Sequence, residues 1–152
     1  MLRYLFVADS PPPVTDADYR SLHEFRHQIR RFLHFSETAA GTEGLEPQQH
    51  QMMLAIRALR EPDDPTVRKL AEHLLVKHHS AVGLIDRLAA HGLVERVRMT
   101  KGDRREVRVR LTEAGEEKLQ RLAAIHRAEL ANSGPLLVEA LASLVRRARE
   151  EE

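Results

Sequence analysis

The stretch from Thr66 to Thr112 constrains the fold of this chain more than any other part. It opens with two short runs whose apolar residues recur at steps of three and four, the spacing of paired amphipathic helices. Two runs of alternating apolar and charged residues follow, joined by a charged tip, Thr100-Lys101-Gly102-Asp103-Arg104-Arg105. One helix of such a pair can enter a DNA major groove while the hairpin reaches neighbouring phosphates or the minor groove. The pattern therefore predicts a DNA-reading helix pair with a β wing.

Basic charge is concentrated in the same stretch, although the formal net charge of the whole chain is only +1. Residues 66–110 contain 11 Lys and Arg against 5 Asp and Glu, whereas residues 1–65 and 111–152 are each net acidic. A patch of one sign is the electrostatic footprint of DNA contact, because neutralising phosphates releases condensed counterions. On charge alone, a solvated charged surface explains the count equally well.

The composition excludes several classes of site. Because cysteine is absent, disulfides, thiol redox sensing and cysteine-based zinc sites are ruled out. No apolar run approaches the roughly 18 residues of a membrane span, and the apolar start, residues 1–8, is too short for a signal sequence. We therefore expect a cytoplasmic protein with no membrane partner, and nothing in the chain indicates a cofactor.

Apolar periodicity predicts a mostly α fold with a small β wing: six helices and one two-stranded antiparallel hairpin. The strands are expected at 94–98 and 107–111, because apolar and charged residues alternate there. Glycine, proline and capping residues mark the helix ends. These signals are Gly41 and Gly44 after a first helix that begins near Asp16, Pro47 at the start of the second, Pro62-Asp63-Asp64-Pro65 after it, Thr66 capping the third, Gly92 closing the fourth, Thr112 capping the fifth, and Asn132-Ser133-Gly134-Pro135 breaking the fifth from the sixth.

The last predicted helix is more apolar than one chain can bury alone, which indicates a partner subunit. The first helix carries a second apolar stripe at helical spacing.

Six landmarks in order give the chain a resemblance to a known family. They are Leu45-Glu46-Pro47-Gln48-Gln49, the Leu70-Ala71 helix, Ser80-Ala81-Val82-Gly83-Leu84-Ile85-Asp86-Arg87-Leu88, His91-Gly92-Leu93-Val94, Asp103-Arg104-Arg105 and Leu111-Thr112-Glu113-Ala114-Gly115. Over residues 16–149 the chain resembles the MarR family of winged helix-turn-helix transcriptional regulators. The resemblance implies a homodimer joined by the first and last helices, a recognition helix in each major groove of a pseudo-palindromic operator, wings in the flanking minor grooves, and a small-molecule pocket near the dimer interface. The residues expected in the dimer interface are Leu22, Phe25, Leu137, Leu141 and Leu144. It divides the chain into an N-terminal arm (1–15), a dimerisation and pocket helix (16–44), a winged helix-turn-helix lobe (45–112) and C-terminal dimerisation helices (113–152).

The resemblance also implies which residues contact DNA. The recognition helix is expected at 77–91, and the wing carboxylate Asp103 is expected to hold Arg105 for entry into a narrow minor groove. Two features depart from the family pattern, because Lys77 stands where a capping Ser, Thr or Asp is preferred and Gly83 has no side chain to read a base. We therefore expect few contacts to base edges compared with contacts to phosphates. The predicted DNA-binding residues are Lys77, His78, His79, Ser80, Val82, Gly83, Arg87, Lys101, Asp103, Arg104 and Arg105.

Two alternatives rest on the histidines of the first helix. His23-Glu24-Phe25-Arg26-His27 fits H-E-x-x-H, the zinc hydrolase motif, with Glu43 or Glu46 as a third ligand. A chain with nine histidines meets this pattern by accident, and we predict that the protein is not an enzyme. The second alternative is a metal- or ligand-binding dimer that uses the stripe His23, His27, Arg30 and His34.

In the preferred interpretation that stripe borders an effector pocket for a small anionic or aromatic molecule. The simpler explanation of the stripe is a polar helix face, or histidines satisfied across the dimer interface. The sequence as a whole favours a sequence-specific double-stranded DNA-binding regulator, a dimeric repressor whose affinity for DNA responds to an effector.

Overall fold

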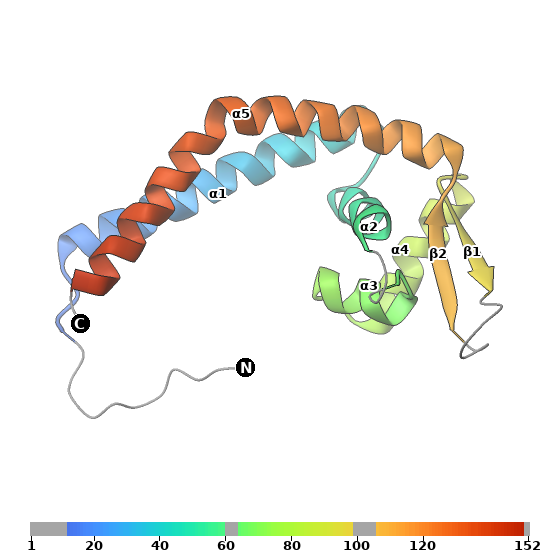
Figure 1. The fold of residues 1–152 in the computed structure, drawn as a ribbon, viewed down its shortest axis with the longest axis horizontal. Coiled ribbons are helices and arrows are strands. Elements are labelled where there is room, and N and C mark those ends of the chain that lie inside the picture. The colour runs from blue at the N-terminus through green and yellow to red at the C-terminus, as the bar shows by residue number, and fades with distance from the viewer. Residues whose placement is uncertain (1–11, 60–63, 99–105, 151–152) are drawn as a thin grey trace. The chain divides into compact units, whose positions relative to one another are not determined.

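The computed structural model describes residues 12–59, 64–98 and 106–150, apart from the side chain of residue 150. Within these ranges the chain forms five helices and one antiparallel pair of strands (Figure 1). This mostly helical fold with a two-stranded wing is the predicted fold class. The elements are α1 (Asp16–Thr42), α2 (Pro47–Ala58), α3 (Val67–Leu74), α4 (His78–Ala90), β1 (Val94–Arg98), β2 (Val107–Leu111) and α5 (Glu113–Glu150).

The predicted break between a fifth and a sixth helix is wrong, because α5 runs without interruption through Asn132-Ser133-Gly134-Pro135. A proline inside a helix removes one backbone hydrogen bond and costs about 3 kcal/mol. Outside Asn132-Ser133-Gly134-Pro135, good helix formers, mainly Ala, Leu and Glu, are frequent over the 38 residues of α5, and they offset this local cost. Gly41 was likewise expected to stop α1 but lies inside it, and the left-handed residue after the helix is Gly44, at φ 71°.

The described chain divides into two compact units. One unit is the continuous segment Leu33–Leu130, and the other joins the residues up to Phe32 with those from Ala131 onward. The helices α1 and α5 each contribute one end to each unit.

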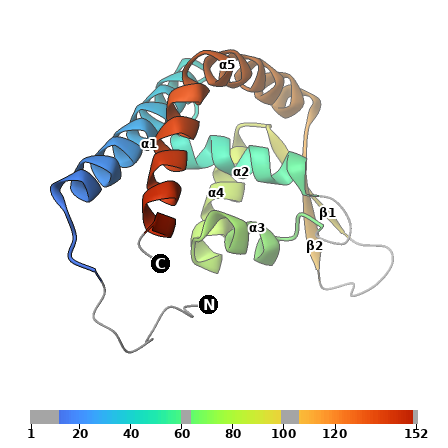
Figure 2. The same ribbon diagram turned by 60° about the vertical axis from the view of Figure 1, so that its left-hand side comes forward.

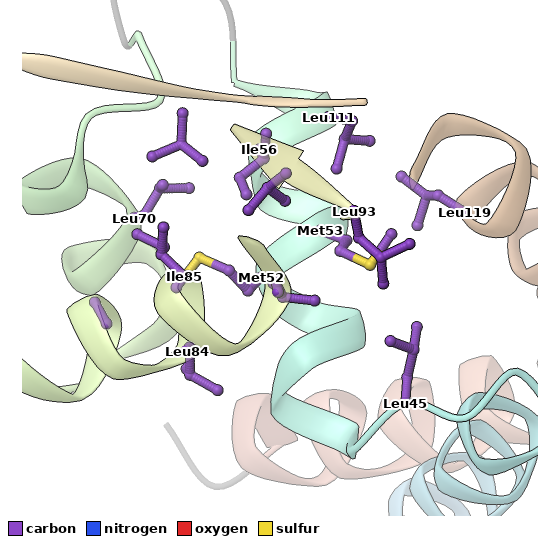
Figure 3. Packing of buried hydrophobic residues seen from close by; sticks show 14 of the residues in the cluster. Leu45, Met52, Met53, Ile56, Leu70, Leu84, Ile85, Leu93, Leu111 and Leu119 are labelled. Carbon is purple, nitrogen blue, oxygen red and sulfur yellow. The ribbon is translucent and has the colours of Figure 1, made fainter. Parts of the chain in front are cut away.

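The continuous unit holds the main hydrophobic core. Met52, Met53 and Ile56 project from α2, and Figure 3 shows them packed among leucines and an isoleucine from the helices and strands around them. β2 lies against α2 and α3, and β1 follows α4 directly (Figure 2). The residues labelled around the three α2 side chains are Leu45, Leu70, Leu84, Ile85, Leu93, Leu111 and Leu119.

Local capping explains where α3 and α5 begin and where α4 ends. Thr66 caps α3 as predicted, because its side-chain oxygen accepts a hydrogen bond from the Lys69 amide at 3.3 Å. At the start of α5, the Thr112 hydroxyl accepts from the Gly115 amide at 3.1 Å. Gly92 adopts the left-handed conformation expected after α4, with φ 71°.

In the discontinuous unit, Asp18 ties the start of α1 to the end of α5. Its carboxylate accepts from the Thr15 amide and hydroxyl, each at 2.7 Å, and from the Arg147 guanidinium at 2.7 Å. The Thr15 hydrogen bonds, followed by that from Arg147, lower the pKa of Asp18 to about 2. Asp18 therefore stays ionised well below the pH at which a free aspartate is protonated.

Candidate nucleic-acid interface

The helix pair predicted to read DNA is formed by α3, a tight turn and α4. The turn places Leu75 in the left-handed region at φ 55°, and the Val76 amide donates to the Ala71 carbonyl at 3.0 Å. The inner face of α4 is the predicted one, buried against α2 and α3. Its buried residues are Ala81, Leu84, Ile85 and Leu88.

The outer face of α4 carries the residues predicted to contact DNA. Ser80, Val82 and Gly83 are half-buried. A side chain at Gly83 would meet the Arg87 guanidinium at 3.5 Å, so Arg87 reaches back over this face towards the first turn of the helix. The exposed members of the set are Lys77, His78, His79 and Arg87.

The first turn of α4 has no side-chain cap, so its backbone amides are available to an anion. Lys77 is the N-cap, with extended backbone angles, and its side chain makes no capping hydrogen bond. The first amides of a helix lack partners within it, and the helix dipole adds partial positive charge there. A DNA phosphate is an anion of the kind that such a helix start binds.

The strands of the wing carry arginines that are not among the predicted DNA contacts. The register pairs Arg96 with Val109 and Arg98 with Val107, so both arginines lie on the face of the hairpin that carries the apolar side chains of β2, yet both are exposed. Arg96 pairs with Asp86 of α4 at 2.7 Å, and Arg110 with Glu95 at 2.6 Å. Alternation along β1 places Arg98 on the same face as the buried Val94, so this pattern gave no signal that Arg98 is exposed.

Some basic side chains of this surface are neutralised by ion pairs, and others are not. Among the described residues of the 66–110 stretch, three Lys and Arg side chains make no ion pair: Lys77, Arg87 and Arg98. Two lie on α4 or at its start and the third at the end of β1. The predicted wing-tip contacts Lys101, Asp103, Arg104 and Arg105 lie outside the described residues.

The histidine stripe of α1 is exposed at His23, His27, Arg30 and His34. The rings of His23 and His27 stack with centroids 6.1 Å apart, and Glu24 accepts a hydrogen bond from Gln28 at 2.7 Å. Across residues 12–59, 64–98 and 106–150, no cluster of three or more His, Cys, Asp or Glu is arranged to hold a metal ion.

Glu43, one of the two residues considered as a third zinc ligand, has other partners. Its carboxylate accepts two hydrogen bonds from Arg121, both at 2.9 Å, and lies 3.9 Å from the Lys118 ammonium. The hydrogen bonds from Arg121 lower the pKa of Glu43. Glu43 therefore ties the residues after α1 to α5. Glu46, the other candidate, is the N-cap residue of α2.

Two histidines that the sequence pattern did not indicate, the buried His50 and the half-buried His126, lie in contact between α1, α2 and α5. His50 is 3% exposed, and its Nδ1 atom has no hydrogen-bond partner among the described residues. Its ring lies 4.9 Å from that of His126, whose nitrogens contact the Leu122 carbonyl at 2.7 Å and the Ser36 hydroxyl at 2.8 Å. Burial, followed by the charge of His126, lowers the pKa of His50. Spacing along the chain gives no signal for such a pair.

The predicted dimerisation residues belong to one unit and are only partly covered. Leu22 is 48% exposed and Leu141 is 46% exposed, while Phe25, Leu137 and Leu144 are half-buried. The same unit exposes further large apolar side chains. These are Val14, Tyr19, Leu136, Val138 and Val145.

None of the described helices combines the length and the apolar character needed to cross a bilayer. Residues 43–106 match the sequence model of the MarR family. A search of the curated proteins finds no match.

Solved MarR structures share this fold over about nine tenths of the chain. The structure of AbsC, a MarR family transcriptional regulator from Streptomyces coelicolor, is 21% identical and covers 91% of this chain and 98% of its own, with a TM-score of 0.69. A MarR family protein from Bacillus stearothermophilus is 21% identical, with the same coverages and a TM-score of 0.67. Wild-type MarR from E. coli is 20% identical and covers 91% of this chain and 97% of its own, with a TM-score of 0.61.

Proposed function

We propose that the chain is a DNA-binding transcriptional regulator of the MarR family, and that it acts as a cytoplasmic, dimeric repressor of a pseudo-palindromic operator. The family consists of regulators rather than enzymes, so the zinc hydrolase hypothesis is not carried forward. The observation that most supports the proposal is the exposed, cationic outer face of α4, a helix whose other face is buried in the core.

In this proposal each subunit places the start of α4 in a major groove. Lys77 and the open first turn bind a phosphate, His78, His79 and Ser80 meet base edges or phosphates, and Val82 contacts a thymine methyl group. Arg87 lies over Gly83, where it can reach a base or the backbone. Arg98 extends the basic surface along the wing, and Lys101, Asp103, Arg104 and Arg105 act at the wing tip. Because only three cations of the described surface are unpaired, we expect a moderate number of phosphate contacts.

Fluorescence anisotropy tests the proposal directly. The protein is titrated onto labelled DNA from its own upstream region and onto scrambled DNA, at several salt concentrations. A repressor binds the upstream DNA selectively, and its affinity falls steeply with salt because each phosphate contact releases counterions. Weak binding that does not depend on sequence would overturn the proposal.

Arg87 and Arg127 provide a matched pair of variants. Both are exposed and cationic, but Arg127 lies on α5, outside the proposed interface. Arg87→Ala should weaken operator binding by roughly 1–3 kcal/mol, the usual range for a specific arginine contact. Arg127→Ala removes the same charge and should change affinity much less. Equal losses in the two variants would mean that only overall charge matters.

We further propose that a small anionic or aromatic effector weakens this binding. Imidazole and guanidinium groups suit an anionic ligand, and the exposed His23, His27, Arg30 and His34 offer both on one helix. Salicylate and benzoate, added to the preformed complex with DNA, are suitable probes. Release of the DNA at millimolar concentration that His27→Gln abolishes would support the stripe as the effector site, and release that the variant leaves unchanged would exclude it.

A further inference from the structure

The base of the wing is joined to the entry of the helix pair by three contacts. The Val109 amide of β2 donates to the Pro65 carbonyl at 2.9 Å. Thr66 and Arg108 form an isolated antiparallel bridge, and the Arg108 guanidinium donates to the Asp64 carboxylate. The segment 64–66 therefore lies alongside β2, which it contacts through one isolated bridge, one further backbone hydrogen bond and one ion pair.

The ion pair in this joint is better shielded from water than the other ion pairs of the wing. The side chains of Arg108 and Asp64 are 32% and 23% exposed, whereas those of Arg110 and Glu95 are 65% and 48% exposed. Shielded charge-assisted hydrogen bonds are stronger than exposed ones, which water and salt weaken. The Asp64–Arg108 pair can therefore fix geometry where the Glu95–Arg110 pair cannot.

The same segment also fixes the helix pair. Thr66, two residues after Asp64, is 7% exposed and caps α3, whose Leu70 and Ala71 are buried in the core with the inner face of α4. Arg108 lies only three residues after Arg105 along the chain. One carboxylate thus connects the strand that carries the wing tip to the helices that present the recognition face.

We propose that Asp64 is a positioning residue for DNA binding, and that it acts through Arg108 to hold the wing in register with the recognition helix. This inference rests on the proposed function. Asp64 contacts no DNA in this scheme. Arg108, though cationic, serves the joint rather than a phosphate, because Asp64 neutralises it.

Asp64→Asn gives a decisive test, because a positioning role and a purely electrostatic effect predict opposite changes in operator affinity. Asp64→Asn removes a negative charge from a DNA-binding surface, so electrostatics alone would tighten binding. If Asp64 positions the wing, the operator affinity should instead fall by about five- to tenfold, the lower part of what one specific arginine contact contributes. The matched control is Glu95→Gln, which removes an equal charge from an exposed pair on the same wing and should not weaken binding.

Two further measurements separate positioning from other causes. Arg108→Gln should also lower affinity but leave the salt dependence unchanged, whereas loss of a phosphate contact lowers the slope by about one. Hydrogen exchange of the Val109 amide, measured by NMR without DNA, should be faster in Asp64→Asn than in the wild type, because its hydrogen bond to Pro65 lies in the joint. Thermal melts of each variant establish that it is folded.

The outcomes distinguish this inference from the proposed function. Tighter or unchanged operator binding by Asp64→Asn, or unchanged Val109 exchange, would overturn the positioning role. A reduced salt slope in Arg108→Gln would make Arg108 a phosphate contact and would equally overturn it. If the wild type binds no DNA selectively, the proposed function fails, and the Val109 exchange still decides whether Asp64 holds the wing.

Discussion

Gly115 should be one of the least replaceable residues of the chain, although it lies in the first turn of a long helix where alanine is normally favoured. A Cβ atom at this position would lie 2.1 Å from the Leu93 carbonyl oxygen and 3.1 Å from its carbon. Ordinary contacts of a Cβ atom begin near 3.4 Å, so relief requires a movement of about 1 Å between two backbone segments.

That movement would break contacts on which the junction between the wing and α5 depends. The Leu93 carbonyl also accepts from the Thr112 amide at 3.0 Å, and the Thr112 hydroxyl donates to the Gly92 carbonyl at 2.6 Å. Overpacking costs about 1–3 kcal/mol, and loss of one of these two hydrogen bonds adds roughly 1 kcal/mol. We therefore expect Gly115→Ala to lower the free energy of unfolding by about 2–4 kcal/mol, which lowers Tm by about 4–16 °C for a chain of this length.

Circular dichroism followed through thermal and urea unfolding measures this effect. The control is Gly41→Ala, because Gly41 is also helical but nothing lies within 4 Å of its Cβ position. Alanine should be neutral there or stabilise by up to about 1 kcal/mol. A Gly115→Ala protein that unfolds within about 0.5 kcal/mol of the wild type would refute the packing described for this junction, since ordinary surface substitutions reach that value.

Two further predictions concern pH and assembly. The pKa of His50 is lowered in the folded chain, so below the ordinary histidine pKa of 6.5 the unfolded chain binds more protons than the folded chain. The free energy of unfolding should therefore decline as the pH falls from 6.5 towards the folded pKa. In urea titrations between pH 5 and 7, His50→Leu should flatten this dependence, and an identical pH profile in the variant would contradict the prediction. If the exposed apolar side chains of α1 and α5 form the dimer interface, Leu141→Asp should yield monomers in analytical ultracentrifugation. The control is Leu75→Asp, which alters an apolar residue that is 92% exposed in the other unit and should leave the dimer intact. A stable Leu141→Asp dimer would refute that interface.

The sequence predicted the parts of the fold that depend on local patterns. The apolar spacing in α4, the alternation in β2 and the caps at Thr66 and Thr112 each arise from neighbours a few residues apart. Pro135 shows the limit of that reasoning, because the tendency of one residue to break a helix was outweighed by the helix formers around it.

The contacts that define the candidate site beyond α4 could not be predicted in the same way. His50 and His126 are 76 positions apart in the sequence, and Asp64 and Arg108 are 44 apart. Such pairs form only because helices or strands distant in the chain pack together, and no spacing rule in one sequence specifies them. The absence of ion pairs at Arg87 and Arg98 could not be predicted either, because the fold decides which acidic side chains lie near which basic ones.

The division of the chain into one continuous and one discontinuous unit has a consequence for biosynthesis. Residues 33–130 form their unit from a single stretch, so its contacts can close once that stretch has left the ribosome. The other unit needs residues 131–150, which are made about a hundred residues after the first half of α1, and closing so long a loop carries a larger entropic cost. The first half of α1, with its apolar residues Leu22 and Phe25, therefore leaves the ribosome well before residues 131–150. During this interval exposed apolar side chains can promote aggregation or bind a chaperone.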